Sequence, residues 1–431
     1  MKFSVISLGC PKNLVDTEYI LGKLNACNAK FVSNPEEADI ILINTCGFIE
    51  PAKEESINTI LEAVNLKEEY KNKKIVVTGC LVERYKNELE KEIPEVDYFI
   101  DLKQEPKIPE KVGLKTVNDT GDTFRVLTTP KHTAYLKISE GCDHTCSFCA
   151  IPNIRGKHRS KPIEALVEEA KILAEQGVKE LNIVSQDTSS YGIDIYGKPS
   201  LWRLIDQLEK IEGIKWIRLY YLYPTTVNED FIKQIANREK IVNYIEMPIQ
   251  HVNDKILKDM MRGYRRKKIE QILEWKEKYV PDMAIRTSVI VGYPAETEKE
   301  FNELVDFIQN AKFDWLGVFE YSHEEGTIAF DKWEDIVPKE EKIRRKNEIT
   351  KIQEKITEEK NKQLIGKELE VLVDGYSEEW ETLPVGRTYR SAYEIDGITY
   401  IETTEPIKAG DFIKVKIKDV IDIVDTVGEI L

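Results

Sequence analysis

The stretch Glu140-Gly141-Cys142-Asp143-His144-Thr145-Cys146-Ser147-Phe148-Cys149 carries three thiols within eight positions, spaced Cys-x3-Cys-x2-Cys. A loop this short can direct all three sulfurs at one point. Clusters of cysteine thiolates select zinc or an iron–sulfur centre. A closed structural zinc site needs four ligands, and His144 is the one candidate for the fourth. An iron–sulfur cubane held by three cysteines would instead keep one iron without a protein ligand, open to a substrate or cofactor.

This spacing, with the aromatic Phe148 directly before the last cysteine, resembles the radical S-adenosylmethionine (SAM) superfamily. The resemblance implies a [4Fe-4S] cluster on Cys142, Cys146 and Cys149, whose open iron binds the methionine part of SAM. In that superfamily an electron passed through the cluster releases a 5′-deoxyadenosyl radical from SAM. By the same resemblance, Phe148 lies against the adenine.

Length and composition limit the classes of protein that this chain can represent. Its 431 residues predict about two to four domains. With 62 basic and 77 acidic residues, the net charge of -15 predicts no general attraction to nucleic acid or to an anionic membrane. No apolar run is long enough to span a membrane, and residues 3–9 are too short for a signal peptide. Seven cysteines without an export signal favour reduced thiols and metal binding over disulfides, so we expect a cytoplasmic protein with no membrane partner.

The first hundred residues alternate between apolar runs and helical patterns. The runs cover residues 2–9, 39–45 and 74–79, and each precedes a helical pattern. Strands that alternate with helices predict a parallel α/β sheet with helices on both faces. We interpret residues 101–133, which contain several Pro and Gly residues, as late sheet elements and a linker.

Cys10, Cys46 and Cys80 each lie one or two residues past the end of one of these strands, about one βα unit apart. The carboxyl ends of parallel strands form the ligand crevice of such a sheet, and a Gly beside each cysteine (9, 47 and 79) lets the backbone come close. We therefore predict a second site with three cysteines, again one ligand short of four. The alternative is three buried cysteines that act only as small apolar side chains. Cys27 has no partner at a suitable spacing, and we interpret it as structural.

From residue 133 a longer α/β series begins. Its predicted strands cover residues 133–139, 180–186, 216–222, 244–250, 284–291 and 315–321, and predicted helices include residues 161–176, 202–210 and 267–279. Six βα units are too few for a complete eight-stranded barrel, so we expect an open partial barrel, (β/α)6. The loop with Cys142, Cys146 and Cys149 follows its first strand, at the end where such folds carry out chemistry.

Polar residues follow three other strands at the same rim. They lie in Ser185-Gln186-Asp187, Gln250-His251 and Gly292-Tyr293-Pro294. We take Gln186, Asp187 and Gly292, together with Phe148, as candidate contacts to the cofactor. The basic residues 262–268 could contact RNA, but a solvated start of a helix is the simpler interpretation.

The C-terminal third changes character. Residues 338–363 predict a charged helix, which we interpret as an arm with a solvated face. Short strands at residues 369–376, 389–395, 398–403 and 412–423, with turns at Asp396-Gly397 and Ala409-Gly410, predict a small OB-like β-barrel. Residues 367–431 hold 7 basic and 15 acidic side chains, so 7 − 15 = −8. This charge would repel RNA and attract a basic protein surface, although an ordinary solvated acidic barrel is the alternative.

The whole chain resembles the methylthiotransferases, which join an N-terminal cluster domain, a radical SAM domain and a C-terminal TRAM domain. We expect these domains at residues 1–125, 126–365 and 366–431. The motifs that carry the resemblance are Ser7-Leu8-Gly9-Cys10-Pro11-Lys12-Asn13, Asn44-Thr45-Cys46-Gly47-Phe48, Thr78-Gly79-Cys80, Ile151-Pro152-Asn153-Ile154-Arg155-Gly156 and Met247-Pro248-Ile249-Gln250-His251. They resemble the branch that acts on ribosomal protein S-twelve, whereas the transfer-RNA branch usually has Gln-Met-Asn after the first cysteine.

This resemblance implies insertion of a methylthio group at the β-carbon of an aspartate of the small-subunit ribosomal protein S-twelve, free or on the ribosomal subunit. It implies a second [4Fe-4S] cluster on Cys10, Cys46 and Cys80, which presents the sulfur, and partners that include a sulfur donor and an electron donor such as a flavodoxin. Both open irons must then face one shared cavity between the first two domains. The alternatives are methylthiolation of adenosine in transfer RNA and a non-catalytic iron–sulfur carrier or sensor.

Overall fold

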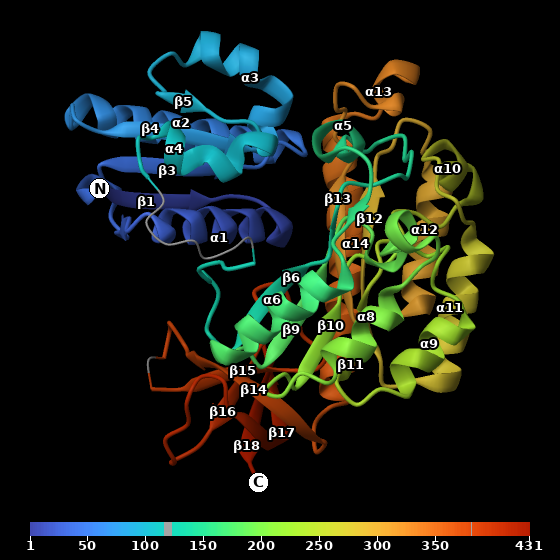
Figure 1. Cartoon of the computed structure of the whole chain (residues 1–431). Coiled ribbons are helices and arrows are strands. Elements are labelled where there is room, and N and C mark those ends of the chain that lie inside the picture. The colour runs from blue at the N-terminus through green and yellow to red at the C-terminus, as the bar shows by residue number, and fades with distance from the viewer. Residues whose placement is uncertain (116–122, 381) are drawn as a thin grey trace.

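A computed structural model of the chain describes residues 1–115, 123–380 and 382–431. Figure 1 shows three parts in chain order: an N-terminal α/β sheet in blue, a larger sheet with helices on its outer side, and a C-terminal barrel in red at the opposite end from the N-terminal part. Within the described ranges, no helix combines the length and the apolar character that crossing a membrane requires.

The N-terminal part is a parallel five-stranded sheet in the order β2-β1-β3-β4-β5, as the alternating pattern predicts. Helices α1 and α4 pack on one face of this sheet, and α2 and α3 pack on the other. The strands are β1 (Lys2–Ser7), β2 (Lys30–Phe31), β3 (Ile40–Thr45), β4 (Lys74–Gly79) and β5 (Tyr98–Phe99). The helices are α1 (Pro11–Ala26), η1 (Pro35–Glu37), α2 (Glu50–Glu69) and α3 (Cys80–Glu92).

The prediction of late sheet elements in residues 101–133 is wrong for the part that the structure describes. The last strand of the sheet, β5, comes before this segment, and the chain continues into η2 (Leu102–Lys107) and α4 (Ile108–Lys111). Pro109 stands near the start of α4, where its missing N–H costs no hydrogen bond. Residues 116–122 of the segment lie outside the described residues.

The central part is a parallel six-stranded sheet in the order β13-β12-β11-β10-β9-β6, which is the open partial barrel expected from six βα units. The strands are β6 (Thr133–Lys137), β9 (Glu180–Val184), β10 (Trp216–Leu219), β11 (Ile241–Glu246), β12 (Ala284–Val291) and β13 (Trp315–Glu320). The helices on its outer side are α6 (Ile163–Glu175), α8 (Leu201–Leu208), α9 (Glu229–Ala236), α11 (Arg266–Tyr279) and α12 (Glu298–Ala311). These helices and the outward strand residues form the largest apolar core of the molecule.

Shorter elements lie at the carboxyl ends of these strands and between them. They are β7 (Ser139–Glu140), α5 (Ile151–Arg155), β8 (Arg159–Ser160), η3 (Thr188–Ser190), α7 (Ile193–Tyr196), α10 (Asp254–Asp259) and α13 (Ile328–Lys332). Figure 1 shows α5 and α13 at the same end of the barrel, next to the N-terminal sheet.

The interpretation of residues 338–363 as a solvated arm is wrong. Helix α14 (Lys339–Lys362) packs along β13 and α12, and it buries Ile349 and Ile356. Gln353 on the same face donates to the carbonyl of Phe313 at 2.9 Å. The helix therefore covers the edge of the open barrel.

The C-terminal part is the small closed β-barrel that the short strands predict, in the order β14-β15-β16-β18-β17. Its strands are β14 (Glu368–Tyr376), β15 (Pro384–Thr388), β16 (Thr399–Glu402), β17 (Phe412–Ile421) and β18 (Asp425–Ile430). Residues 389–395 do not form the predicted strand because they reach into the central barrel. There Arg390 pairs with Asp314 at 2.5 Å, and its carbonyl accepts the indole N–H of Trp315 at 2.6 Å.

Candidate functional site

The loop with three cysteines begins where β7 ends and folds back on the chain that follows it. Gly141 has φ +78, and a Cβ at this position would lie 2.2 Å from the carbonyl oxygen of Lys157. The backbone N–H of Cys142 then donates to the carbonyl of Gly156 at 3.1 Å. Only glycine fits such a close approach with this backbone conformation, so Gly141 allows the loop to close.

The three thiols of this loop lie near one another in a buried environment. Burial raises the pKa of Cys142 to about 11 and that of Cys149 to about 12, and in both cases the neighbouring Cys146 raises it further. Because a metal ligand must be the deprotonated thiolate, binding of a cationic centre here would be coupled to proton release.

Arg262 contributes a charged hydrogen-bond donor to this loop. Its Nη1 lies 3.3 Å from Cys146 Sγ, its Nη2 donates to the carbonyl of Pro248 at 3.0 Å, and its Nε donates to Tyr264 Oη at 2.9 Å. The interpretation of residues 262–268 as a solvated helix start is therefore wrong for Arg262, which is buried. A guanidinium that faces a thiolate forms a charge-assisted hydrogen bond.

His144, the candidate fourth zinc ligand, has other partners. Its ring stacks on Tyr223, with 3.7 Å between ring centroids and 13° between planes, and its Nε2 lies 2.7 Å from Asp187 Oδ2. Burial alone would raise the pKa of Asp187, but hydrogen bonds from His144, Ser189 and Ser190 lower it. The carboxylate of Asp187 therefore orients the imidazole and caps the short helix η3.

The other predicted cofactor contacts lie at the same rim. Gln186 donates through Nε2 to Glu140 Oε1 at 2.6 Å. Phe148 is half-buried and packs between the main core and a smaller apolar cluster at the carboxyl ends of the strands. Gly292 has φ +75, and a Cβ there would lie 2.4 Å from the Cγ of Lys342 on α14, so packing against this helix already requires glycine.

Cys10, Cys46 and Cys80 follow the ends of β1, β3 and β4, and close backbone approaches join their loops. Gly9 has φ +88, and a Cβ at this position would lie 2.9 Å from Cys46 Sγ. At Gly47 a Cβ would lie 2.7 Å from the Cα of the residue after Cys80, on helix α3. These approaches are those expected of glycines beside the predicted second site.

The three N-terminal thiols also influence one another. Burial raises the pKa of Cys46, and Cys10 raises it further. Burial raises the pKa of Cys80 to about 12, and both Cys10 and Cys46 add to this effect. The three sulfurs therefore share one partly buried environment.

Arg155 connects the two groups of cysteines across the boundary between the first two parts. It lies on α5, directly after the loop that ends at Cys149, and its Nη2 and Nε lie 3.1 and 3.3 Å from Cys80 Sγ. Cys80 also packs against Ala150 and Ile154 of the same segment. The loop of Cys149 and the N-terminal cysteines are therefore direct neighbours.

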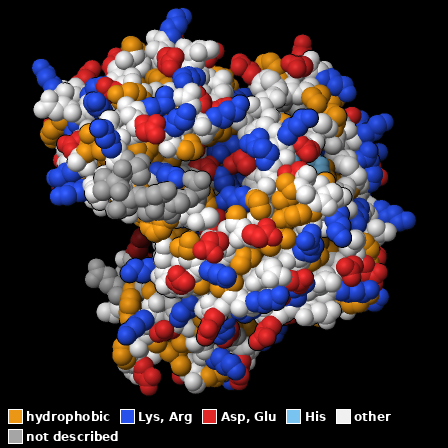
Figure 2. Space-filling model, viewed as in Figure 1, with side chains coloured by type: hydrophobic (Ala, Val, Ile, Leu, Met, Phe, Trp, Pro, Cys, Tyr) orange, Lys and Arg blue, Asp and Glu red, His pale blue; other side chains and the backbone are white. Residues whose placement is uncertain are grey.

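Buried charges surround this junction. Arg155 donates to Asp16 on α1 at 2.6 Å, and Lys137 at the end of β6 bonds to both Asp16 and Glu140. Figure 2 shows acidic and basic side chains together in the depression between the N-terminal part and the central barrel. The two parts therefore meet through ion pairs as well as through apolar contacts.

Comparison with known proteins places all three parts in known families. Family models match residues 2–101 (uncharacterized protein family UPF0004), 136–308 (radical SAM superfamily) and 365–431 (TRAM domain). The ribosomal protein uS12 methylthiotransferase RimO of Sulfurihydrogenibium sp. (strain YO3AOP1) is 72% identical over 429 residues, which cover 100% of this chain and 99% of that protein. The protein of the same name from Aquifex aeolicus (strain VF5) is 52% identical over 422 residues, covering 98% and 96%.

The chain belongs to the RimO family. Two solved structures share its fold at low sequence identity. The radical SAM methyltransferase TsrM from Kitasatospora setae has a TM-score of 0.51 at 11% identity, covering 74% of this chain and 72% of that one. The cobalamin-dependent SAM radical enzyme OxsB has a TM-score of 0.52 at 14% identity, covering 81% and 56%.

The donors at both cysteine groups fit the [4Fe-4S] cluster that the radical SAM part of the RimO family implies. One group offers three soft thiol ligands from a single loop and the other offers three from adjoining loops. A buried guanidinium donates to one sulfur of each group. In the described residues no three Cys, His, Asp or Glu side chains are arranged around a single metal ion. In a cubane each of the three cysteines binds a different iron. The three cysteine sulfurs therefore need not be close enough to bind one ion together.

The sequence alone does not identify Arg155 or Arg262 as site residues. Arg155 lies within a motif that the sequence pointed to without a role, whereas Arg262 lies in a run of basic residues with no distinguishing signal. Spacing identifies ligands that come from one loop, but it does not show which arginine turns inward from another loop.

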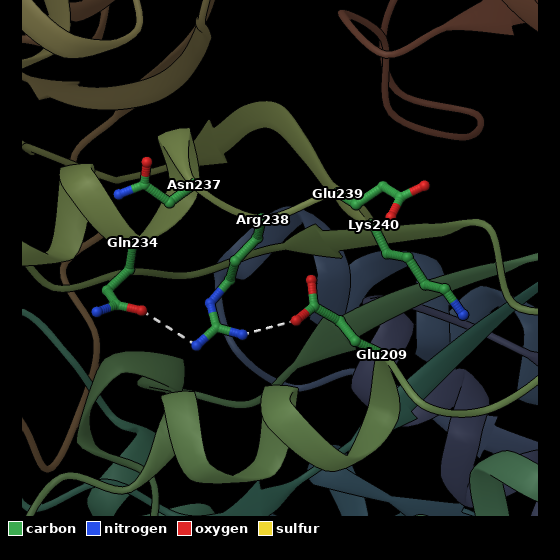
Figure 3. Close-up of a pocket in the computed structure, with 6 residues that line it drawn as sticks. All are labelled: Glu209, Gln234, Asn237, Arg238, Glu239 and Lys240. Carbon is green, nitrogen blue, oxygen red and sulfur yellow. Dashed lines mark hydrogen bonds and ion pairs between the residues drawn. The ribbon is translucent and has the colours of Figure 1, made fainter.

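Two cavities in the described part of the chain are lined by no cysteine. Figure 3 shows one of about 370 Å³ at the amino end of β11, where Arg238 pairs with Glu209 at 2.6 Å and with Gln234 at 3.1 Å. Arg238 and Glu209 satisfy each other there, and Lys240 donates to the carbonyl of Ile211 at 2.8 Å. Since chemistry in this kind of barrel takes place at the carboxyl ends of the strands, we assign this cavity no function.

Proposed function

We propose that this chain is a radical SAM methylthiotransferase that modifies ribosomal protein uS12 at the β-carbon of an aspartate. Membership of the RimO family supports the reaction and the substrate. The observation that carries the proposal is the contact of Arg155 with Cys80, because it makes two groups of three cysteines neighbours across a domain boundary. A reaction that joins a carbon radical to sulfur needs the source of the radical and the source of the sulfur side by side.

The cofactors would divide between the two groups. Cys142, Cys146 and Cys149 would hold one [4Fe-4S] cluster with SAM, and Cys10, Cys46 and Cys80 would hold a second. Bound together, the first cluster and SAM supply a 5′-deoxyadenosyl radical, which can take hydrogen from a C–H bond that acid–base catalysis cannot reach. Phe148, Gln186, Asp187 and Gly292 remain our candidates for contacts to SAM.

The residues of this chain would position the substrate and exclude water. Arg155 holds the helix that follows Cys149 against Cys80, and this contact would keep the two groups beside one substrate. Asp187 fixes His144 on Tyr223 and thereby closes one side of the thiol loop. Such fixed placement is the main contribution that a protein makes when its cofactor supplies the reactive species.

The proposed partners are uS12, an electron donor such as a flavodoxin and a donor of sulfur, in the cytoplasm. The net charge of −8 in residues 367–431 supports a basic protein substrate over transfer RNA, whose phosphates this barrel would repel. We place the domain boundaries after residues 125 and 365.

The test is turnover of the reconstituted, reduced protein with SAM, uS12 and transfer RNA together. We expect the mass of one methylthio group on uS12 and release of 5′-deoxyadenosine. The Cys142→Ala variant should release none, whereas Cys10→Ala should still release it, lose about half of the bound iron and transfer no sulfur. A mass gain only on the RNA, or unchanged iron in Cys10→Ala, would contradict the proposal.

A further inference from the structure

Lys12 carries a positive charge from the N-terminal part to the mouth of the central barrel. It lies two residues after Cys10, in the first turn of α1, and is only 7% exposed. Its Nζ lies 3.4 Å from the ring centroid of Tyr221, just beyond the end of β10. A cation of one domain thus stands at the rim where the other domain carries its cysteine loop.

The ammonium of Lys12 differs from other buried cations at this boundary because it has no anionic partner among the described residues. Lys137 bonds to Asp16 and Glu140, and Lys161 pairs with Glu169 at 3.1 Å. Lys12 has the ring of Tyr221 as its contact. A buried charge without a counter-ion is costly, so such a group is suited to an anion that arrives from outside.

One carboxyl group interacts electrostatically with Lys12 but forms no ion pair with it among the described residues. Glu246, at the end of β11, is near enough for Lys12 to lower its pKa, although burial raises that pKa to about 7. Its buried Oε2 has no hydrogen-bond partner, so this oxygen does not hold the ammonium of Lys12. Tyr221 has φ +54, which is uncommon for an aromatic residue and is typical of functional sites.

Cys10 influences the hydroxyl of Tyr221 electrostatically. Burial raises the pKa of Tyr221 well above its ordinary value, and Glu246 and Cys10 both raise it further. The ring under the ammonium is therefore also a neighbour of the first thiol of the N-terminal group.

We propose that Lys12 binds the side-chain carboxylate of the aspartate that the enzyme modifies. This inference rests on the proposed function. The carboxylate carbon is bonded directly to the β-carbon that receives the sulfur, so the carboxylate must lie within a few ångströms of the place where sulfur is delivered. A cation two residues from Cys10, without a partner of its own, fits that requirement.

The experiment compares the holoenzyme with its Lys12→Met and Lys12→Arg variants, and uS12 with a uS12 variant whose target aspartate is asparagine. Methionine keeps the unbranched shape of lysine and all but one atom of its length, and it removes the charge. We expect Lys12→Met to weaken binding of natural uS12 by about tenfold or more, as loss of a buried charged contact does. The asparagine variant of uS12 should bind equally to the wild-type enzyme and to Lys12→Met. The effects of the enzyme substitution and the substrate substitution on affinity should therefore be non-additive.

Lys12→Arg should restore part of the affinity for natural uS12, since arginine keeps the charge. As a matched control, Lys67→Met removes the same charge from α2, where Lys67 pairs with Asp97, and should leave both affinities unchanged. Iron content and thermal unfolding of each variant distinguish a folding defect from a loss of binding.

An equal loss of affinity for both forms of uS12 would overturn the inference. So would a Lys12→Met effect confined to the dependence of rate on sulfide concentration, because the ammonium would then bind the sulfur anion. If the wild-type holoenzyme neither binds nor modifies uS12, the proposed function fails instead, and the two failures are distinguishable.

Discussion

At the scale of single residues, two arginines have matching positions. Arg155 donates to Cys80 Sγ and Arg262 donates to Cys146 Sγ, so each group of cysteines has one buried guanidinium. Hydrogen bonds to the sulfurs of an iron–sulfur cluster stabilise its more negative, reduced state. If each group holds a cluster as proposed, each arginine should influence the cluster at its own cysteines and have little effect on the other.

Replacement of either arginine by glutamine should lower the midpoint potential of one cluster only. Arg155→Gln should affect the centre at Cys80, and Arg262→Gln the centre at Cys146, because the lost donor no longer stabilises added negative charge. Redox titration of the loaded protein followed by electron paramagnetic resonance measures both. Lysine at either position should restore part of the potential. Two variants that shift the same signal would show that the assignment is wrong.

At the scale of elements, α14 shows how a polar composition conceals a packing face. Its sequence predicts a solvated arm, yet Ile349, Gln353 and Ile356 recur at intervals of four and three residues and face the barrel. The buried charged residues of the helix have partners, since Arg345 pairs with Glu296 at 2.8 Å. A long side chain can bury its stem while its charge is paired, so a count of charges underestimates the contact that a helix makes.

The short helix η2 depends on a carboxyl group at its packing surface. Glu105 is buried under the end of β4, where its Oε1 lies 2.9 Å from Thr78 Oγ1. Burial raises the pKa of Glu105 to about 8, and the nearby Asp16 raises it further. The folded protein therefore binds a proton at Glu105 that the unfolded chain releases near pH 4.5.

Glu105→Gln should stabilise the protein at alkaline pH. Because folding raises the pKa of Glu105, this side chain contributes fully to the stability of the wild-type protein at low pH. That contribution is lost as the pH rises from the unfolded pKa of 4.5 to the folded pKa of about 8. One pKa unit corresponds to about 1.4 kcal/mol, and glutamine cannot ionise. The difference in unfolding free energy should thus favour the variant increasingly between pH 5 and pH 8. Denaturant unfolding at these two pH values tests this, and a difference independent of pH would contradict it.

At the scale of the whole molecule, buried ion pairs join the three parts. Arg125 bonds to Glu18 on α1 and lies 3.1 Å from Glu169 on α6. At the other end of the barrel, Arg387 of the C-terminal part lies 2.9 Å from Glu180 on β9, and both are nearly inaccessible to water. The N-terminal and C-terminal parts are thus held to the central barrel at opposite ends.

Arg387→Met should lower the unfolding free energy by about 3 kcal/mol, because it leaves Glu180 buried with one arginine partner fewer. Arg218, at 3.0 Å from Glu180, remains and limits the loss. Calorimetric unfolding of the variant measures the effect, and Glu180→Gln in the same chain should recover part of it. Lys215→Met is the matched control, because its pair with Glu370 also joins the two parts but is exposed, and it should change stability by less than about 1 kcal/mol. Equal effects of the two variants would contradict this account.

The sequence by itself determined the order of the three parts, the parallel sheets, the closed terminal barrel and both groups of cysteines. These features depend on local spacing and on strand ends, which periodicity reveals directly. It did not determine that α14 covers the barrel edge, that residues 389–395 insert into the barrel, that Lys12 reaches the ring of Tyr221, or that Arg155 and Arg262 donate to Cys80 and Cys146. Those contacts join residues far apart in the chain, and a charged side chain has the same local pattern whether its partner is water or a buried sulfur, so only the tertiary structure decided them.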